Sequence, residues 1–150
     1  MPVNISEKQW NDAIQNSEAD PGLIYAKSVF FNQPERKIIT RFQINFIERT
    51  DELRFMPANL MMAYLPYFVR FIITCRHDEF DKSAIADCFF SLLEGKLSDD
   101  TINTIELLHK SKDALLFISN RLDEFNTDPD IYGNLQPRLH HLITLLDQKA

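Results

Sequence analysis

The chain has 150 residues, a net charge of −6 and 45% hydrophobic residues, a composition typical of one folded domain of ordinary size. The negative charge would repel phosphate backbones and anionic lipids, so it argues against nucleic acid and membrane as partners. Three glycines are too few for a typical glycine-rich phosphate loop, which argues against a nucleotide cofactor. We therefore expect a single globular domain over residues 1–150.

Residues 6–17 are predicted to form the first helix. Ser6 and Gln9 have the spacing of a capping box, in which each side chain accepts a hydrogen bond from the backbone N–H of the other residue. The sequence Asp20-Pro21-Gly22 then favours a turn, because proline and glycine interrupt a helix.

The N-terminal sequence lacks the basic start and the apolar run of a secretory signal. The only two cysteines, Cys75 and Cys88, are too few for a disulfide framework. We therefore expect a cytoplasmic protein whose two thiols are reduced.

Residues 23–55 carry a pattern typical of β-strands. Phe42, Ile44 and Phe46 alternate with polar residues, and this period of two is expected where one face of a strand is buried. The segments 32–35 and 50–52 are rich in turn-forming residues and would connect the strands. The prediction is a small antiparallel β-meander over 23–55, although the same apolar residues also fit one face of a helix.

The most apolar stretch of the chain predicts a central helix over residues 57–77. The apolar run itself, residues 60–75, is shorter than the roughly 20 apolar residues that a membrane span requires, and it contains Pro66 and the charged Arg70. On a helix, the polar residues Arg70, Thr74 and His77 fall on one narrow strip, and apolar residues occupy most of the remainder. We expect protein to surround this helix, with the strip facing water or a partner.

Beyond residue 80, apolar residues at helical spacing predict three or four further helices. Asp81 is the expected N-cap of the first, Gly95 is expected to end it, and Ser98 is expected to open the next one. The last helix has an apolar face from Leu135 to Leu146. The predicted fold class is mainly α (α+β), with five to six helices around the central helix and the small meander. An all-α helical bundle is the alternative.

No local motif indicates a catalytic, cofactor or metal site. The run His77-Asp78-Glu79-Phe80-Asp81 is dense in metal-ligating side chains, but its spacing fits no zinc pattern and is better interpreted as a polar turn. The segment from Asp128 onward begins like an EF-hand calcium loop, but Tyr132 and Leu139 occupy positions that require oxygen ligands. We therefore assign no catalytic, cofactor-binding or metal-binding residue.

Two features provide candidate contacts for a protein partner. Arg70, Thr74 and His77 form the polar strip, which is either a contact site, a merely solvated edge or, at Arg70, an internal ion pair. Ile131 and Tyr132 lie in a turn-rich segment, where apolar side chains either fold back onto the protein or stay exposed as anchors.

The expected function is that of a non-enzymatic protein–protein interaction module, such as an adaptor, a chaperone-like factor or an immunity-type partner. Small size, acidity and the missing catalytic motif support this expectation. The acidity is concentrated in residues 81–150, where seven Lys and Arg against twelve Asp and Glu leave a net charge of −5, which favours a partner with a basic surface. Homo-oligomerisation stays open. The alternative is a small hydrolase or transferase whose dispersed site uses His77 or His109 with nearby carboxylates.

Overall fold

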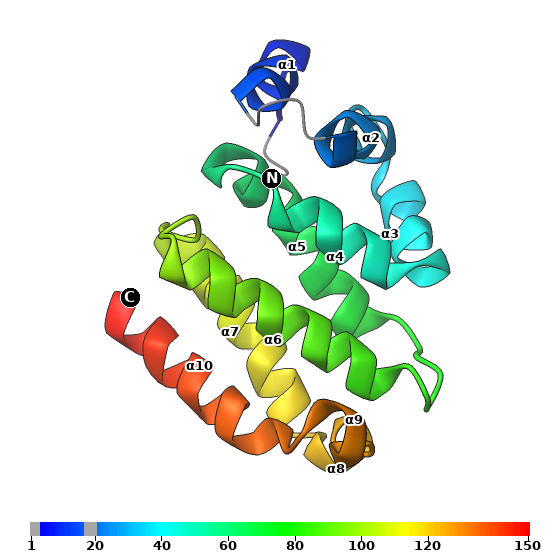
Figure 1. Ribbon diagram of the computed structural model, residues 1–150, viewed down its shortest axis with the longest axis vertical. Helices are drawn as coiled ribbons and strands as arrows, with labels where there is room; N and C mark the ends of the chain where they lie inside the picture. The colour runs from blue at the N-terminus through cyan, green and yellow to red at the C-terminus, as the bar shows by residue number, and fades with distance from the viewer. Residues whose placement is uncertain (1–3, 17–20) are drawn as a thin grey trace.

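The computed structural model describes residues 4–16 and 21–150, and all regular secondary structure in these residues is helical. The predicted helix end at Ser17 and the turn residue Asp20 lie outside the described residues. In chain order the helices are α1 (Glu7–Asn16), α2 (Pro21–Phe30), α3 (Glu35–Ile44), α4 (Phe46–Arg54), α5 (Ala58–Thr74), α6 (Lys82–Ser98), α7 (Ile105–Ser119), α8 (Leu122–Phe125), α9 (Pro129–Tyr132) and α10 (Leu135–Lys149) (Figure 1).

The β-meander predicted over residues 23–55 is wrong, because this segment forms α2, α3 and α4. The alternation of Phe42, Ile44 and Phe46 arises where two helices meet at Asn45. Phe42 and Phe46 are buried whereas Ile44 is 74% exposed, so the three side chains do not share one face as a strand would require. The side chain of Asn45 accepts a backbone hydrogen bond at the start of α4 and so fixes the break. The fold is the all-α bundle that was the alternative, and it has more helices than the five to six predicted.

The first helix begins with the predicted capping box. The backbone N–H of Gln9 donates to Ser6 Oγ at 3.2 Å, and the backbone N–H of Ser6 donates to Gln9 Oε1 at 2.8 Å. Behind this cap, the indole of Trp10 is fully buried and its Nε1 donates to the hydroxyl of Tyr64 at 3.1 Å. This hydrogen bond ties α1 to α5.

The predicted central helix is confirmed as α5, although it ends at Thr74 and not at His77. Nine of its 17 residues are buried, and α3, α4 and α7 pack around it. Cys75 has an extended backbone, which turns the chain away from the helix. Within the part of the chain that the structure describes, no helix has the length and apolar character needed to cross a membrane.

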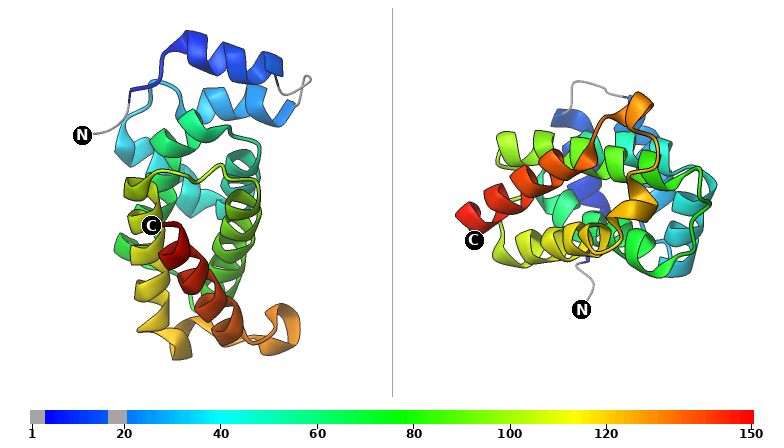
Figure 2. Two further views of the ribbon diagram at one scale, coloured as in Figure 1. Left: turned by 90° about the vertical axis from the view of Figure 1, so that its left-hand side faces the viewer. Right: turned by 90° about the horizontal axis from the view of Figure 1, so that it is seen from below.

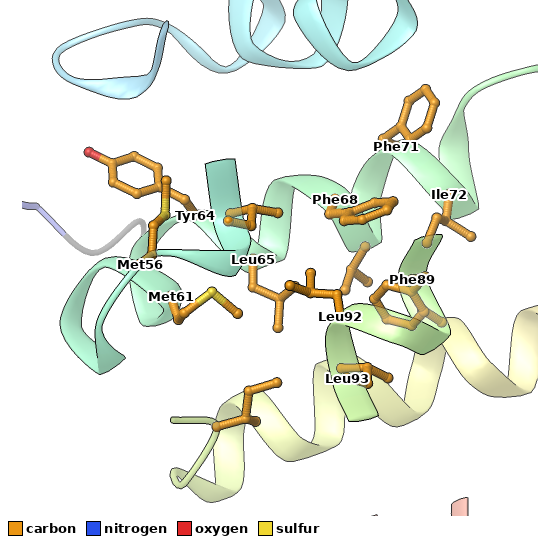
Figure 3. Packing of buried hydrophobic residues seen from close by; sticks show 14 of the residues in the cluster. Met56, Met61, Tyr64, Leu65, Phe68, Phe71, Ile72, Phe89, Leu92 and Leu93 are labelled. Atoms are coloured by element: carbon orange, nitrogen blue, oxygen red, sulfur yellow. The ribbon is translucent and has the colours of Figure 1, made fainter. Parts of the chain in front are cut away.

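Aromatic side chains of α5 join the two halves of the bundle. Phe68 is fully buried, and its ring lies 5.2 Å from Phe42 of α3 and 5.3 Å from Phe89 of α6, measured between ring centroids. Tyr64 and Phe71 point away from α6, whereas Leu65 points toward it (Figure 3). Aromatic residues bury large apolar areas, so this layer makes a large contribution to the stability of the fold.

The remaining helices extend the bundle away from α1. Helix α6 packs against α4 and α10, and α10 also packs against α7. Leu135, Leu139, Leu142 and Leu146 are buried, which confirms the apolar face predicted for the last helix. The short helices α8 and α9 lie at the end of the molecule opposite α1 (Figures 1 and 2).

Two predicted helix boundaries are wrong. Gly95 lies inside α6 and does not end it, and nothing lies within 4 Å of the position where a Cβ would be. Ser98 is the last residue of α6 and does not open the next helix. The chain instead reverses at Asp100, which has a φ of 61°, and α7 begins after Thr104, whose side chain caps the helix.

Candidate functional site

The structure keeps Arg70 and Thr74 of the predicted polar strip together on α5 but separates His77 from them. Arg70 is exposed on α5 and forms an ion pair with Glu35 of α3. Thr74 is also exposed, and its hydroxyl donates to the backbone carbonyl of Arg70 at 2.7 Å. His77 lies beyond the end of α5, where its Nε2 is 3.1 Å from the carbonyl oxygen of Ile72. Arg70 and His77 therefore line two different cavities.

The cavity next to Arg70 is a groove of about 720 Å³ beside α5, which we call the α5 groove. Its lining includes aromatic residues and two ion pairs, namely Phe30, Phe31, Tyr64, Tyr67, Arg70–Glu35 and Lys110–Glu106. Burial raises the pKa of Tyr64 and of Tyr67, so both hydroxyls stay protonated and can form hydrogen bonds. The two cations are already neutralised by their carboxylate partners, which leaves the groove without a marked charge preference.

The cavity next to His77 is a pocket of about 310 Å³, which we call the end pocket. It lies where the end of α5, the start of α6 and the turn from α7 to α8 meet, and it is lined by Cys75, Arg76, His77, Lys82, Phe117, Arg121, Glu124 and Phe125. Burial lowers the pKa of His77, and the Lys82 ammonium acts in the same direction, whereas the Ile72 carbonyl and Asp81 oppose the shift. His77 is therefore neutral near pH 7. His109 is exposed on α7 and lines neither cavity.

The two apolar residues predicted as anchors have different environments. Tyr132 is half-buried and packs against the hydrophobic core, whereas Ile131 is 70% exposed. Both belong to α9, which packs against α6 and ends at Gly133, where the backbone has a φ of 74°. Thus Tyr132 attaches the short helix to the protein and Ile131 is left facing solvent.

Carboxylates gather around Tyr132. Burial raises the pKa of its hydroxyl, and Asp87, Asp128 and Asp81 lie close enough to raise it further. Asp130 is exposed next to Ile131 in α9. We call the surface formed by Ile131, Tyr132, Asp81, Asp87, Asp128 and Asp130 the acidic face.

Most of the negative charge on the acidic face is uncompensated. Arg138 of α10 binds Asp87, with 2.7 Å between Nη1 and Oδ1. Asp81, Asp128 and Asp130 form no ion pair with any residue in the described ranges 4–16 and 21–150. Ile131 is therefore exposed beside Asp130 on α9, and the neighbouring Tyr132 has the unpaired carboxylates of Asp81 and Asp128 near it.

Sequence patterns gave no local signal for the cations of the end pocket. Arg76 and Lys82 come from the segment that leads from α5 into α6, whereas Arg121 follows α7, so the three cations meet only when α7 packs beside α5. Ile131 and the acidic composition of the second half of the chain, by contrast, were visible in the sequence. What the sequence could not show is that Asp81 and Asp87 lie next to α9.

Within the described residues, no group of three or more His, Cys, Asp or Glu side chains is arranged to hold a metal ion. Comparison with known proteins finds no matching family model, no matching curated protein and no matching solved structure. The functional interpretation of this chain therefore depends on its own geometry.

Proposed function

We propose that the protein is a non-enzymatic interaction module of the cytoplasm, of the adaptor, chaperone-like or immunity type, and that it docks a basic partner protein on the acidic face. The observation that carries this proposal is the 70% exposure of Ile131 on α9, a helix that bears Asp130 and has the unpaired carboxylates of Asp81 and Asp128 near its Tyr132. Arg70, Thr74 and His77 stay predicted contacts, and the acidic face does not depend on them.

The proposed contact combines two forces. Covering exposed apolar surface stabilises a complex by about 25 cal/mol per Å² of area removed from water. Unpaired carboxylates at the rim attract Lys and Arg side chains, which speeds association and selects partners of opposite charge. The partner segment that fits this surface has an apolar residue to cover Ile131 and basic residues on either side to pair with the carboxylates.

The charge also bears on self-association. In a symmetric dimer each copy presents the same patch to the other, so the unpaired carboxylates of two acidic faces would oppose each other. This repulsion favours a different protein as the partner on this face. The α5 groove is less suited to charge-selective docking, because its two cations are paired with carboxylates of the same chain.

The test uses fluorescence anisotropy with two labelled amphipathic peptides, one of leucine and lysine and one of leucine and glutamate. We expect only the lysine peptide to bind, with an affinity that falls as salt is raised, because ions screen exposed charges. Ile131→Ser should weaken binding by about fivefold to tenfold, the loss expected for an interface anchor. Asp128→Asn combined with Asp130→Asn should weaken it further.

Ile44→Ser is the matched control, since Ile44 is 74% exposed on α3 and lies outside the acidic face. It should bind the lysine peptide as the wild type does. Equal losses for Ile131→Ser and Ile44→Ser, or equal binding of the two peptides, would sink the proposal. Thermal unfolding of each variant checks that folding is intact.

A further inference from the structure

The end pocket concentrates positive charge in a protein whose net charge is −6. Three permanent cations, Arg76, Lys82 and Arg121, line it together with a single carboxylate, that of Glu124. Glu124 is already bound to Lys82, with 3.1 Å between Oε1 and Nζ. Within the described part of the chain, Arg76 and Arg121 form no ion pair, so two guanidinium groups border the pocket without a carboxylate partner.

Arg121 is held in place by the wall of the pocket. The centre of its guanidinium group lies 3.9 Å from the centroid of the Phe117 ring, and its Nη1 donates to the Phe117 carbonyl at 3.3 Å. A guanidinium group has five N–H donors, so one hydrogen bond leaves most of them available. Stacking on an aromatic ring restricts the plane of the group, which lowers the entropy lost when an anion binds.

The remaining lining is small and consists of His77 and three apolar side chains. Phe117, Phe125 and Cys75 provide a wall beside the cations. A volume of about 310 Å³ lies at the lower end of the roughly 300–1,000 Å³ found for ligand pockets, which favours a compact ligand. Lys82 is also the first residue of α6, so the positive end of that helix dipole adds to the local potential.

The geometry points to a binding site for a small phosphate monoester, whose phosphate is held by Arg76 and Arg121 and whose organic group packs against Phe117. Arginine suits this ligand because its planar fork matches two phosphate oxygens at once. Asp81 acts on His77 and lowers the positive potential near the pocket, so affinity in the micromolar to millimolar range is expected and not tighter. None of the residues that line this site belongs to the acidic face.

Isothermal titration calorimetry at about 0.15 M salt provides the test, with phenyl phosphate as the probe. We expect saturable binding at one site, binding several-fold weaker for inorganic phosphate, and none for phenol. Arg121→Gln should weaken phenyl phosphate binding by about tenfold, the loss expected when a charge-assisted hydrogen bond is removed. Arg36→Gln is the matched control, because it makes the same charge change at an exposed residue of α3 outside the pocket.

Three outcomes would overturn the proposal. The first is a titration that does not saturate at millimolar phenyl phosphate, and the second is an equal loss for Arg36→Gln and Arg121→Gln, which would indicate unspecific attraction. The third is tighter binding of a phosphoserine peptide than of phenyl phosphate, which would assign the cations to a phosphorylated protein. If Arg121→Gln fails to fold, Arg76→Gln takes its place, since Arg76 is exposed and its loss should leave the core unchanged.

Discussion

The acidic face and the end pocket both include residues from the beginning of α6 and the segment before it, yet their charges are opposite. The segment that leads into α6 supplies Arg76 and Lys82 to the end pocket and Asp81 to the acidic face. Exposed charges are screened over about 8 Å in physiological salt, so neighbouring surfaces can attract different ligands. The net charge of −6 therefore describes neither surface, because the fold places the cations at one of them and the unpaired carboxylates at the other.

The two surfaces share one structural support, which is the contact between the start of α6 and the segment from α8 to α9. The Ser83 hydroxyl of α6 forms hydrogen bonds with the backbone of Phe125 and of Thr127 in this segment, and the Phe125 side chain is buried in the core. Substitutions in this contact should disturb both the acidic face and the end pocket. A substitution of a residue that belongs to only one of the two surfaces should disturb that surface alone.

Phe125→Ala should have the largest effect. Phe125 is 1% exposed and its ring meets Phe117 edge-on at 6.3 Å between centroids, so truncation leaves a cavity in the core. The free energy of unfolding, measured by urea denaturation, should fall by about 3–5 kcal/mol. Phe80→Ala is the matched control, because Phe80 is 89% exposed, and it should change this free energy by less than about 0.5 kcal/mol. Similar losses for both variants would contradict the packing described here.

Ser83→Ala should lower the free energy of unfolding by an intermediate amount. It should also disturb the acidic face more than the end pocket. The buried hydroxyl of Ser83 donates to the carbonyl of Phe125 at 2.5 Å and accepts from the backbone N–H of Thr127 at 3.2 Å. Alanine leaves both backbone groups without these partners, which should lower the free energy of unfolding by about 1–3 kcal/mol.

The control for this prediction is Ser98→Ala, at an exposed position in the last turn of the same helix. Its free energy of unfolding should equal that of the wild type within about 0.5 kcal/mol. Because Thr127 directly precedes Asp128, Ser83→Ala should also lower the affinity for the lysine peptide more than the affinity for phenyl phosphate. A loss of phenyl phosphate binding alone would show that Ser83 supports the end pocket and not α9.

The sequence predicted the parts of the fold where helical periodicity is uninterrupted. Helix α5 was predicted because its apolar residues cover most of a helical surface, and α10 because its leucines share one face. The segment 23–55 was mispredicted because a helix junction at Asn45 places Phe46 two residues after the exposed Ile44, and a short junction imitates the period of a strand. Tertiary packing, which the sequence does not display, decided between the two interpretations.

The candidate sites were predicted only in part. Ile131 was a predicted contact, and its exposure is consistent with that role, whereas Tyr132 is partly buried and packs against the core. Arg70 and His77 were expected on one strip, but α5 ends between them. The end pocket was not predicted at all, since Arg121 and Arg76 are far apart in the sequence and meet only through the packing of α7 beside α5.

His77→Gln should have the smallest effect, which is confined to the end pocket. We expect it only as a change in how the free energy of unfolding depends on pH. Burial lowers the pKa of His77 in the folded protein below its ordinary value of 6.5. Above about pH 6.5 the imidazole is neutral in both states, so its contribution to stability is fully present. As the pH falls below this value, the unfolded chain binds the proton first, and stability is lost until the folded protein is protonated as well.

The measurement compares the free energy of unfolding near neutral pH with that in mild acid for three proteins. The wild type should lose more stability on acidification than His77→Gln, by an amount smaller than the loss caused by Ser83→Ala. His109→Gln, which changes an exposed histidine of α7, should follow the wild type. If His77→Gln also follows the wild type, the imidazole is not shielded from water in the folded state. Saturating phenyl phosphate should reduce the difference between the wild type and His77→Gln, because a bound phosphate anion favours the protonated imidazole and so opposes the effect of burial.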